Sequence, residues 1–260
     1  MDISADLLKQ IYDSLQQYNP TVNALTGKVE AAMRLFGMAI LAILFIMELQ
    51  ETSMRLDREE GGLTYEILGQ LAINYMIAFV LVNNAGHLID AIVWFGGWIA
   101  KWMGKIMPTG SILQNIPNPK GNMSWYIRPL VYFFQALAQI CQWLISALAT
   151  LIVFMRATSM YIYKAFSPLI VAFFMSKELR QIAVGFLKQF AAIVLQGALL
   201  IFIIGIMSTS VVSDLSFTMS SKSSWLSNIG VYMAVILKQF AMGYLVIGSQ
   251  GLAKRILGAM

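Results

Sequence analysis

Four basic residues lie in stretches of the chain that are otherwise apolar enough to enter a bilayer: Arg156, Lys164, Lys188 and Lys238. Charged side chains are costly at membrane depth, so they usually face a packed interior or a polar pathway. Long basic side chains also reach lipid headgroups from helices near the membrane surface. The sequence makes these residues candidates for a polar interior or a conduit, and it leaves the surface interpretation open.

A Ser-Pro pair, Ser167 and Pro168, follows Lys164 on the same stretch. Proline lacks a backbone N–H and clashes with the carbonyl group four residues earlier, so we expect the helix to break or bend just after Ser167. Broken helices that carry charges line the cavities of many transport proteins. The pair therefore predicts a helix break beside a candidate conduit residue.

A second polar group, Asn83, His87 and Asp90, recurs at helical spacing. On one continuous helix, His87 and Asp90 would be within side-chain reach and could line a pore or relay protons. The alternative is a hydrated turn between two helices, because Asn-Asn-Ala-Gly at 83–86 is typical of turns. We prefer the turn and keep His87 and Asp90 as candidate conduit residues.

Small residues recur every four positions at Gly96, Ala100 and Gly104. Such a stripe lets a neighbouring helix approach closely, so we expect it to be a helix-packing surface.

Trp94, Trp98 and Trp102 fall on another face of the same segment, which also carries Lys101 and Lys105. Aromatic and basic side chains together can stack on single-stranded nucleic acid and neutralise it. They are also the usual anchors of a helix at the lipid headgroup boundary. We prefer the anchor interpretation for the tryptophans and retain the two lysines as candidates for a conduit.

The composition indicates what must position these residues. Of 260 residues, 58% are hydrophobic and 12% are charged, and the mean hydropathy is +0.70. Soluble domains carry about 25% charged residues, so this is a polytopic membrane protein. The apolar runs are long and do not alternate, which predicts an all-α transmembrane bundle instead of a β-barrel.

We expect five to seven membrane spans, since a span needs about 20 apolar residues. The candidate spans lie near 31–50, 65–85, 87–106, 129–154, 157–176, 181–210 and 229–250. The span at 157–176 contains Lys164 and Pro168, so it is alternatively a kinked continuation of the preceding span. Residues 31–260 then form a single transmembrane domain.

Residues 1–30 are expected to form an amphipathic segment, because apolar residues between Ile3 and Leu15 recur at near-helical spacing. Its helix should end near Asn19 and Pro20. This segment either lies on the membrane surface or docks onto a partner.

The basic residues suggest an orientation. In the seven-span arrangement, six of the 18 Lys and Arg residues lie on the amino-terminal side, one is inside a span and eleven lie on the opposite side. Positive charge favours the cytoplasm, so the count predicts an external amino terminus and a cytoplasmic carboxyl terminus.

Signatures of catalysis are absent from the sequence. It has one His and one Cys, no His-Glu-x-x-His metal motif, no nucleophile elbow and no phosphate-binding Gly-Lys-Ser/Thr loop. We therefore expect no catalytic residue, no metal site, no cofactor and no enzymatic activity.

The segment 155–200 resembles the TrbL-like polytopic subunits of conjugative type IV secretion systems, which are related to the VirB-type inner-membrane channel subunit. The resemblance lies in YIYKAFSPLIVAFF at 161–174, Glu178-Leu179-Arg180, GFLKQFAA at 185–192 and Leu195-Gln196-Gly197. It implies a non-enzymatic component of the cytoplasmic membrane that assembles as a ring-like homo-oligomer and frames the path of a relaxase-bound single DNA strand. The resemblance also implies an external amino terminus and an internal carboxyl terminus. Partners would include a secretion ATPase and a coupling protein.

Lipids are further expected partners, because basic and aromatic helix ends favour bound anionic phospholipid. Two other classes remain open from the residues alone. One is a small-molecule channel or secondary transporter that uses Pro168, His87 and Asp90, and the other is a purely structural membrane scaffold.

Overall fold

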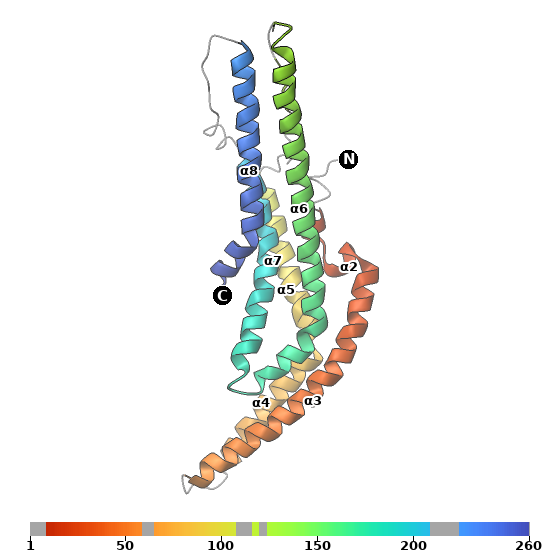
Figure 1. The fold of residues 1–260 in the computed structure, drawn as a ribbon. Helices are drawn as coiled ribbons and strands as arrows, with labels where there is room; N and C mark the ends of the chain where they lie inside the picture. Colours follow the sequence, from red (N-terminus) through yellow and green to blue (C-terminus); the bar gives the residue numbers. More distant parts are fainter. Residues whose placement is uncertain (1–8, 59–64, 108–115, 120–123, 209–223, 260) are drawn as a thin grey trace. The chain divides into compact units, whose positions relative to one another are not determined.

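The computed structural model describes residues 9–58, 65–107, 116–119, 124–208 and 224–259. All regular secondary structure within them is helical, which confirms the predicted all-α class (Figure 1). The elements are α2 (Leu15–Tyr18), α3 (Pro20–Arg58), α4 (Tyr65–Asn83), α5 (Ala85–Ile106), α6 (Arg128–Val171), the 3-10 turn η1 (Ala172–Phe174), α7 (Arg180–Ser208) and α8 (Ser224–Ile256).

The amino-terminal segment is a series of short helical pieces joined by caps. Residues 9–12 are helical, and Ser14 then starts α2 with a capping box in which Gln17 is the reciprocal partner. The Asn19 side chain accepts a hydrogen bond from the Val22 N–H at 3.1 Å, and Pro20 takes the first position of α3. The predicted boundary at Asn19 and Pro20 is therefore correct. The predicted residues 1–8 lie outside the described part of the chain.

The described helices make this a multi-pass membrane protein. Four are long and apolar enough to cross a bilayer, namely Pro20–Met54, Arg128–Phe174, Arg180–Met207 and Trp225–Ile256. A bent pair, Ile67–Asn83 and Ala85–Ile106, meets at 66° and counts as a fifth span or as a re-entrant segment. The predicted range of five to seven spans is met only at its lower end.

Two of the predicted spans, 129–154 and 157–176, are one continuous helix, α6. The alternative of a continuation is therefore the correct one. The predicted span at 31–50 also begins earlier than expected, since α3 runs without interruption through residue 30. The prediction of a single transmembrane domain over 31–260 stays a prediction.

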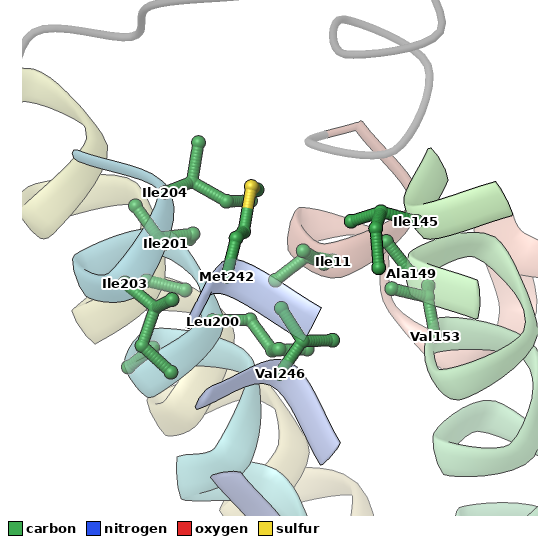
Figure 2. Close-up of a cluster of buried hydrophobic side chains, with 12 residues drawn as sticks. Ile11, Ile145, Ala149, Val153, Leu200, Ile201, Ile203, Ile204, Met242 and Val246 are labelled. Atoms are coloured by element: carbon green, nitrogen blue, oxygen red, sulfur yellow. The ribbon is translucent and has the colours of Figure 1, made fainter. Parts of the chain in front are cut away.

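The chain forms two compact units, each built from separate stretches. The first unit draws its described residues from 1–12, 96–156 and 195–253. Its core joins Ile11 and Ala100 to apolar side chains of α6, α7 and α8. Figure 2 shows this cluster, with Ile11 in view between Met242 of α8 and Ile145 of α6.

The second unit draws its described residues from 13–95, 157–194 and 254–260. One of its apolar clusters centres on Ile89, Tyr161 and Phe190, where the end of α6 packs on the start of α7. Another cluster joins α3 and α4 to the η1 turn around Leu41, Val82 and Met175. In Figure 1, α3 and α4 run side by side. The ion pair described next lies within this second unit.

Candidate functional site

The central polar contact of the second unit is an ion pair between α6 and α5. The Lys164 Nζ lies 2.7 Å from both carboxylate oxygens of Asp90 and 3.5 Å from the amide oxygen of Asn23 on α3. The Lys164 side chain is 9% exposed, whereas that of Asp90 is 45% exposed. The Lys164 ammonium is thus buried, whereas the Asp90 carboxylate is partly exposed at the surface of the helical bundle.

Tyr161 fixes the position of Lys164 relative to the amino-terminal pieces. It lies almost one turn earlier on α6, and its hydroxyl donates to the Leu15 carbonyl at 2.6 Å, with the Asn19 carbonyl at 3.3 Å. These carbonyls belong to α2 and to the residue that caps α3. The hydrogen bond therefore ties α6 to the α2–α3 junction and brings Asn23 within reach of Lys164.

The Ser-Pro pair lies inside α6 instead of ending it, because the helix continues to Val171 before the η1 turn. Pro168 has no N–H for the carbonyl four residues earlier, which is that of Lys164. The buried Ser167 hydroxyl donates to this carbonyl at 2.9 Å and satisfies it. On the α3 side, a Cβ on Gly37 would lie 2.6 Å from the Pro168 carbonyl oxygen, so only glycine allows this approach. The predicted helix break after Ser167 is therefore wrong, because this hydrogen bond and the packing against Gly37 let α6 continue to Val171.

A second ion pair lies on α3. The Arg34 Nη2 is 3.2 Å from the Glu30 Oε1, and the Glu30 side chain is 10% exposed. The carboxylate lies against the first turn of α5, where a Cβ on Gly86 would collide with it. Sequence reasoning missed Glu30, Asn23 and Tyr161. The i,i+4 spacing of Glu30 and Arg34 was the one available signal, and it predicts a pair without predicting burial.

His87 and Asp90 do not pair. α4 ends at Asn83 and α5 begins at Ala85, so the turn that we preferred is present, at Asn84. His87 is exposed, and Asp90 contacts Lys164 instead. The site therefore combines Asp90 with a residue 74 positions later in the chain.

Arg156 lies in the first unit and is 5% exposed. A Cβ on Gly197 of α7 would lie 2.6 Å from its guanidinium carbon, so glycine at that position makes room for the charge. Lys238 of α8 is half-buried, and the neighbouring Gln239 is buried. In the described part of the chain, the Gln239 Oε1 has no hydrogen-bond partner. Lys188 of α7 is exposed.

An aromatic and basic hollow of about 410 Å³ lies in the first unit. It is lined by Tyr12, Trp98, Lys101, Trp102 and Lys105 together with Gly104. The rings of Trp98 and Trp102 stack with centroids 6.4 Å apart, and burial raises the pKa of the Tyr12 phenol. Both lysines are exposed.

The small-residue stripe of α5 has Gly96 and Ala100 buried and Gly104 half-buried. A Cβ on Gly104 would collide with the Tyr12 hydroxyl, so this end of the stripe receives the amino-terminal segment. Trp94, on the same helix, is exposed. The candidate residues thus fall into several places, and the Lys164 and Asp90 pair joins charged groups of two different helices.

Among the described residues, no group of three His, Cys, Asp or Glu side chains is placed to hold a metal ion. The chemistry of the site is that of charge neutralisation inside an apolar bundle. Comparison of the sequence with protein-family models and with curated proteins gave no match, and comparison with solved structures gave none either. The fold and the site define a multi-pass helical membrane protein with a buried ion pair.

Proposed function

We propose that this protein is a non-enzymatic, TrbL-like subunit of a conjugative type IV secretion system. In this role it frames the path along which DNA crosses the cytoplasmic membrane. Its partners would be further copies of itself, the secretion ATPase, the coupling protein, a relaxase-bound single strand and membrane lipids. The proposal combines the resemblance over residues 155–200 with the membrane-spanning character of the helices.

One observation carries the proposal. The part of the resembling segment that lies in the second unit, 157–194, contains the end of α6, the η1 turn and the start of α7. Tyr161 packs with Phe190, and the Tyr163 hydroxyl donates to the Gln189 Oε1 at 3.0 Å, so the two helices pair in antiparallel fashion. This hairpin holds Lys164 against Asp90. The segment of resemblance thus coincides with the element that places a charge inside the bundle.

The orientation rests on the resemblance alone, because the basic residues divide evenly over the observed helices. By the bounds of the five spans, twelve of the 18 Lys and Arg residues lie inside spans, and the remaining six split three to three. By sequence order the amino-terminal side has Lys9, Lys120 and Lys222, and the opposite side has Arg55, Arg58 and Lys177. The sequence predicted more basic residues on the side opposite the amino terminus, because seven spans place the 107–127 segment on that side of the membrane. An external amino terminus and a cytoplasmic carboxyl terminus remain part of the proposal.

The test is an in-frame deletion of the gene on its mobile element, followed by measurement of transfer frequency to a recipient strain. We expect transfer to be lost and to return with the wild-type gene supplied in trans. The Asp90→Asn variant should restore it poorly, and Glu178→Gln, which neutralises an exposed carboxylate, should restore it well. Normal transfer by the deletion strain would refute the proposal.

A small-molecule channel or secondary transporter is the second candidate, and the half-exposed Asp90 beside an enclosed Lys164 favours it. Paired charges inside a bundle mark proton and substrate pathways in many transporters. If the deletion leaves transfer intact but changes uptake of a labelled solute into cells, this candidate replaces the first. If the protein is a structural scaffold, its deletion would abolish transfer, but the subunit would make no contact with the transferred strand.

A further inference from the structure

A basic hollow of about 600 Å³ lies in the second unit beside the start of α7. Its cations are Lys177, Arg180 and Lys188, and its neutral donors include the side-chain amides of Gln181 and Gln189. The volume is within the range of about 300–1,000 Å³ that is usual for small-ligand sites. Every charged residue that lines it among the described residues is positive.

The positive charge of the hollow is largely uncompensated. In the described part of the chain, neither Arg180 nor Lys188 forms an ion pair. Lys177 has its Nζ 3.5 Å from the Glu48 Oε1, but its side chain is 69% exposed and can turn toward the hollow. The first turn of α7 adds the positive end of a helix dipole. The hollow therefore favours an anionic group with several acceptor oxygens.

The backbone keeps the hollow open. Gly258 has φ +57°, a left-handed conformation that favours glycine, and ends α8 so that Gly258 and Ala259 line the hollow. The Ala259 N–H donates to the Lys254 carbonyl at 2.9 Å, which fixes this turn. On α7, a Cβ on Gly185 would meet no atom within 4 Å, so Gly185 faces free space.

The hollow lies where two spans end. α6 with η1 finishes at Phe174 and α7 begins at Arg180, so we expect this end of the hollow to lie at the depth of lipid headgroups. Ile182 and Val184, in the first two turns of α7, are exposed apolar side chains. Basic pockets at the ends of helices, next to apolar surface, suit lipids with anionic headgroups. We propose that this hollow binds the phosphate group of an anionic phospholipid.

The experiment uses the full chain, purified in detergent and stripped of native lipid. Dihexanoyl phosphatidylglycerol, dihexanoyl phosphatidylcholine and inorganic phosphate are titrated separately, and binding is followed by calorimetry. We expect saturable binding of phosphatidylglycerol and much weaker binding of the other two. Equal binding of phosphatidylcholine would overturn an anion site, and inorganic phosphate that binds as tightly as phosphatidylglycerol would overturn a lipid site.

Variants separate the hollow from general surface charge. Arg180→Gln with Lys188→Gln should weaken phosphatidylglycerol binding about thirtyfold, whereas Lys9→Gln with Lys28→Gln removes the same charge elsewhere and should change it less than about twofold. Equal losses in the two double variants would overturn the proposal.

A second pair of variants changes the space without changing the charge. Gly185→Leu should fill the hollow and abolish binding, and Gly248→Leu, at another glycine with open space on α8, should not. Unchanged binding by Gly185→Leu would also overturn the proposal. The proposal does not depend on the secretion function, since all readouts use the isolated protein.

Discussion

Removing either partner of the Lys164 and Asp90 pair should have unequal effects on stability, because the two side chains differ in burial. The variants are Asp90→Asn, Lys164→Met and the double replacement. Asparagine keeps the shape of Asp90 without its charge, and methionine keeps most of the length of Lys164. The comparison therefore isolates charge from packing.

The expected magnitudes follow from the exposed fractions. Asp90→Asn leaves an ammonium that is 9% exposed with only neutral amide oxygens as acceptors, that of the new asparagine and that of Asn23 at 3.5 Å. Breaking a fully buried pair costs about 3–5 kcal/mol, and because Asp90 is 45% exposed we expect about 2 kcal/mol here. Lys164→Met leaves a half-exposed carboxylate and should cost about 0.5–1 kcal/mol. The double variant leaves neither charge uncompensated and should lie within about 1 kcal/mol of the wild type.

The assay is unfolding of the detergent-purified protein by sodium dodecyl sulfate, followed by circular dichroism at fixed pH near neutrality. The four proteins form a double-mutant cycle, from which the coupling energy of the pair is read directly. A loss for Lys164→Met that equals or exceeds the loss for Asp90→Asn would refute the assignment of Lys164 as the enclosed partner. Additive losses would show that the two charges do not interact.

Three further predictions use the same unfolding assay. Tyr161→Phe removes the hydroxyl that donates to the Leu15 carbonyl at 2.6 Å, and it should cost about 1–2 kcal/mol; no loss would contradict this hydrogen bond. Gly37→Ala places a methyl group 2.6 Å from the Pro168 carbonyl oxygen and should cost about 1–3 kcal/mol. Gly185→Ala meets nothing within 4 Å and should stabilise α7 by about 0.5–1 kcal/mol, so similar effects of the two glycine substitutions would contradict the close approach of α3.

Much of the fold could be predicted because its signals are local. Long apolar runs gave the helical membrane class, and Asn19 followed by Pro20 marked the end of the amino-terminal helical segment. The start of α3 directly at Pro20 was not predicted. Span number was harder to predict. Pro168 removes one hydrogen bond, but the hydroxyl of Ser167 replaces it, and Gly37 admits the carbonyl that faces α3. The Gly37 contact depends on how α3 packs against α6, which the spacing of residue types in the sequence does not reveal.

The candidate site was also predictable only where its signals are local. The apolar context of Lys164 marked it as a residue that needs a partner, and Asp90 was one of several carboxylates that could supply it. The choice depends on how α5 and α6 pack, over a separation of 74 residues. Periodicity also could not reveal Tyr161 or Asn23, because both act through the capped junction before α3.

If this subunit frames the path of DNA, the transferred strand should crosslink to it during mating. A photoreactive amino acid replaces Lys101, which is exposed in the aromatic and basic hollow, or Leu151, an exposed apolar residue of α6, as the control. Donor cells are irradiated during transfer, and the transferred strand is recovered with the subunit by immunoprecipitation. We expect DNA on the Lys101 variant and none on the Leu151 variant. Active transfer with no DNA on either variant would contradict this expectation.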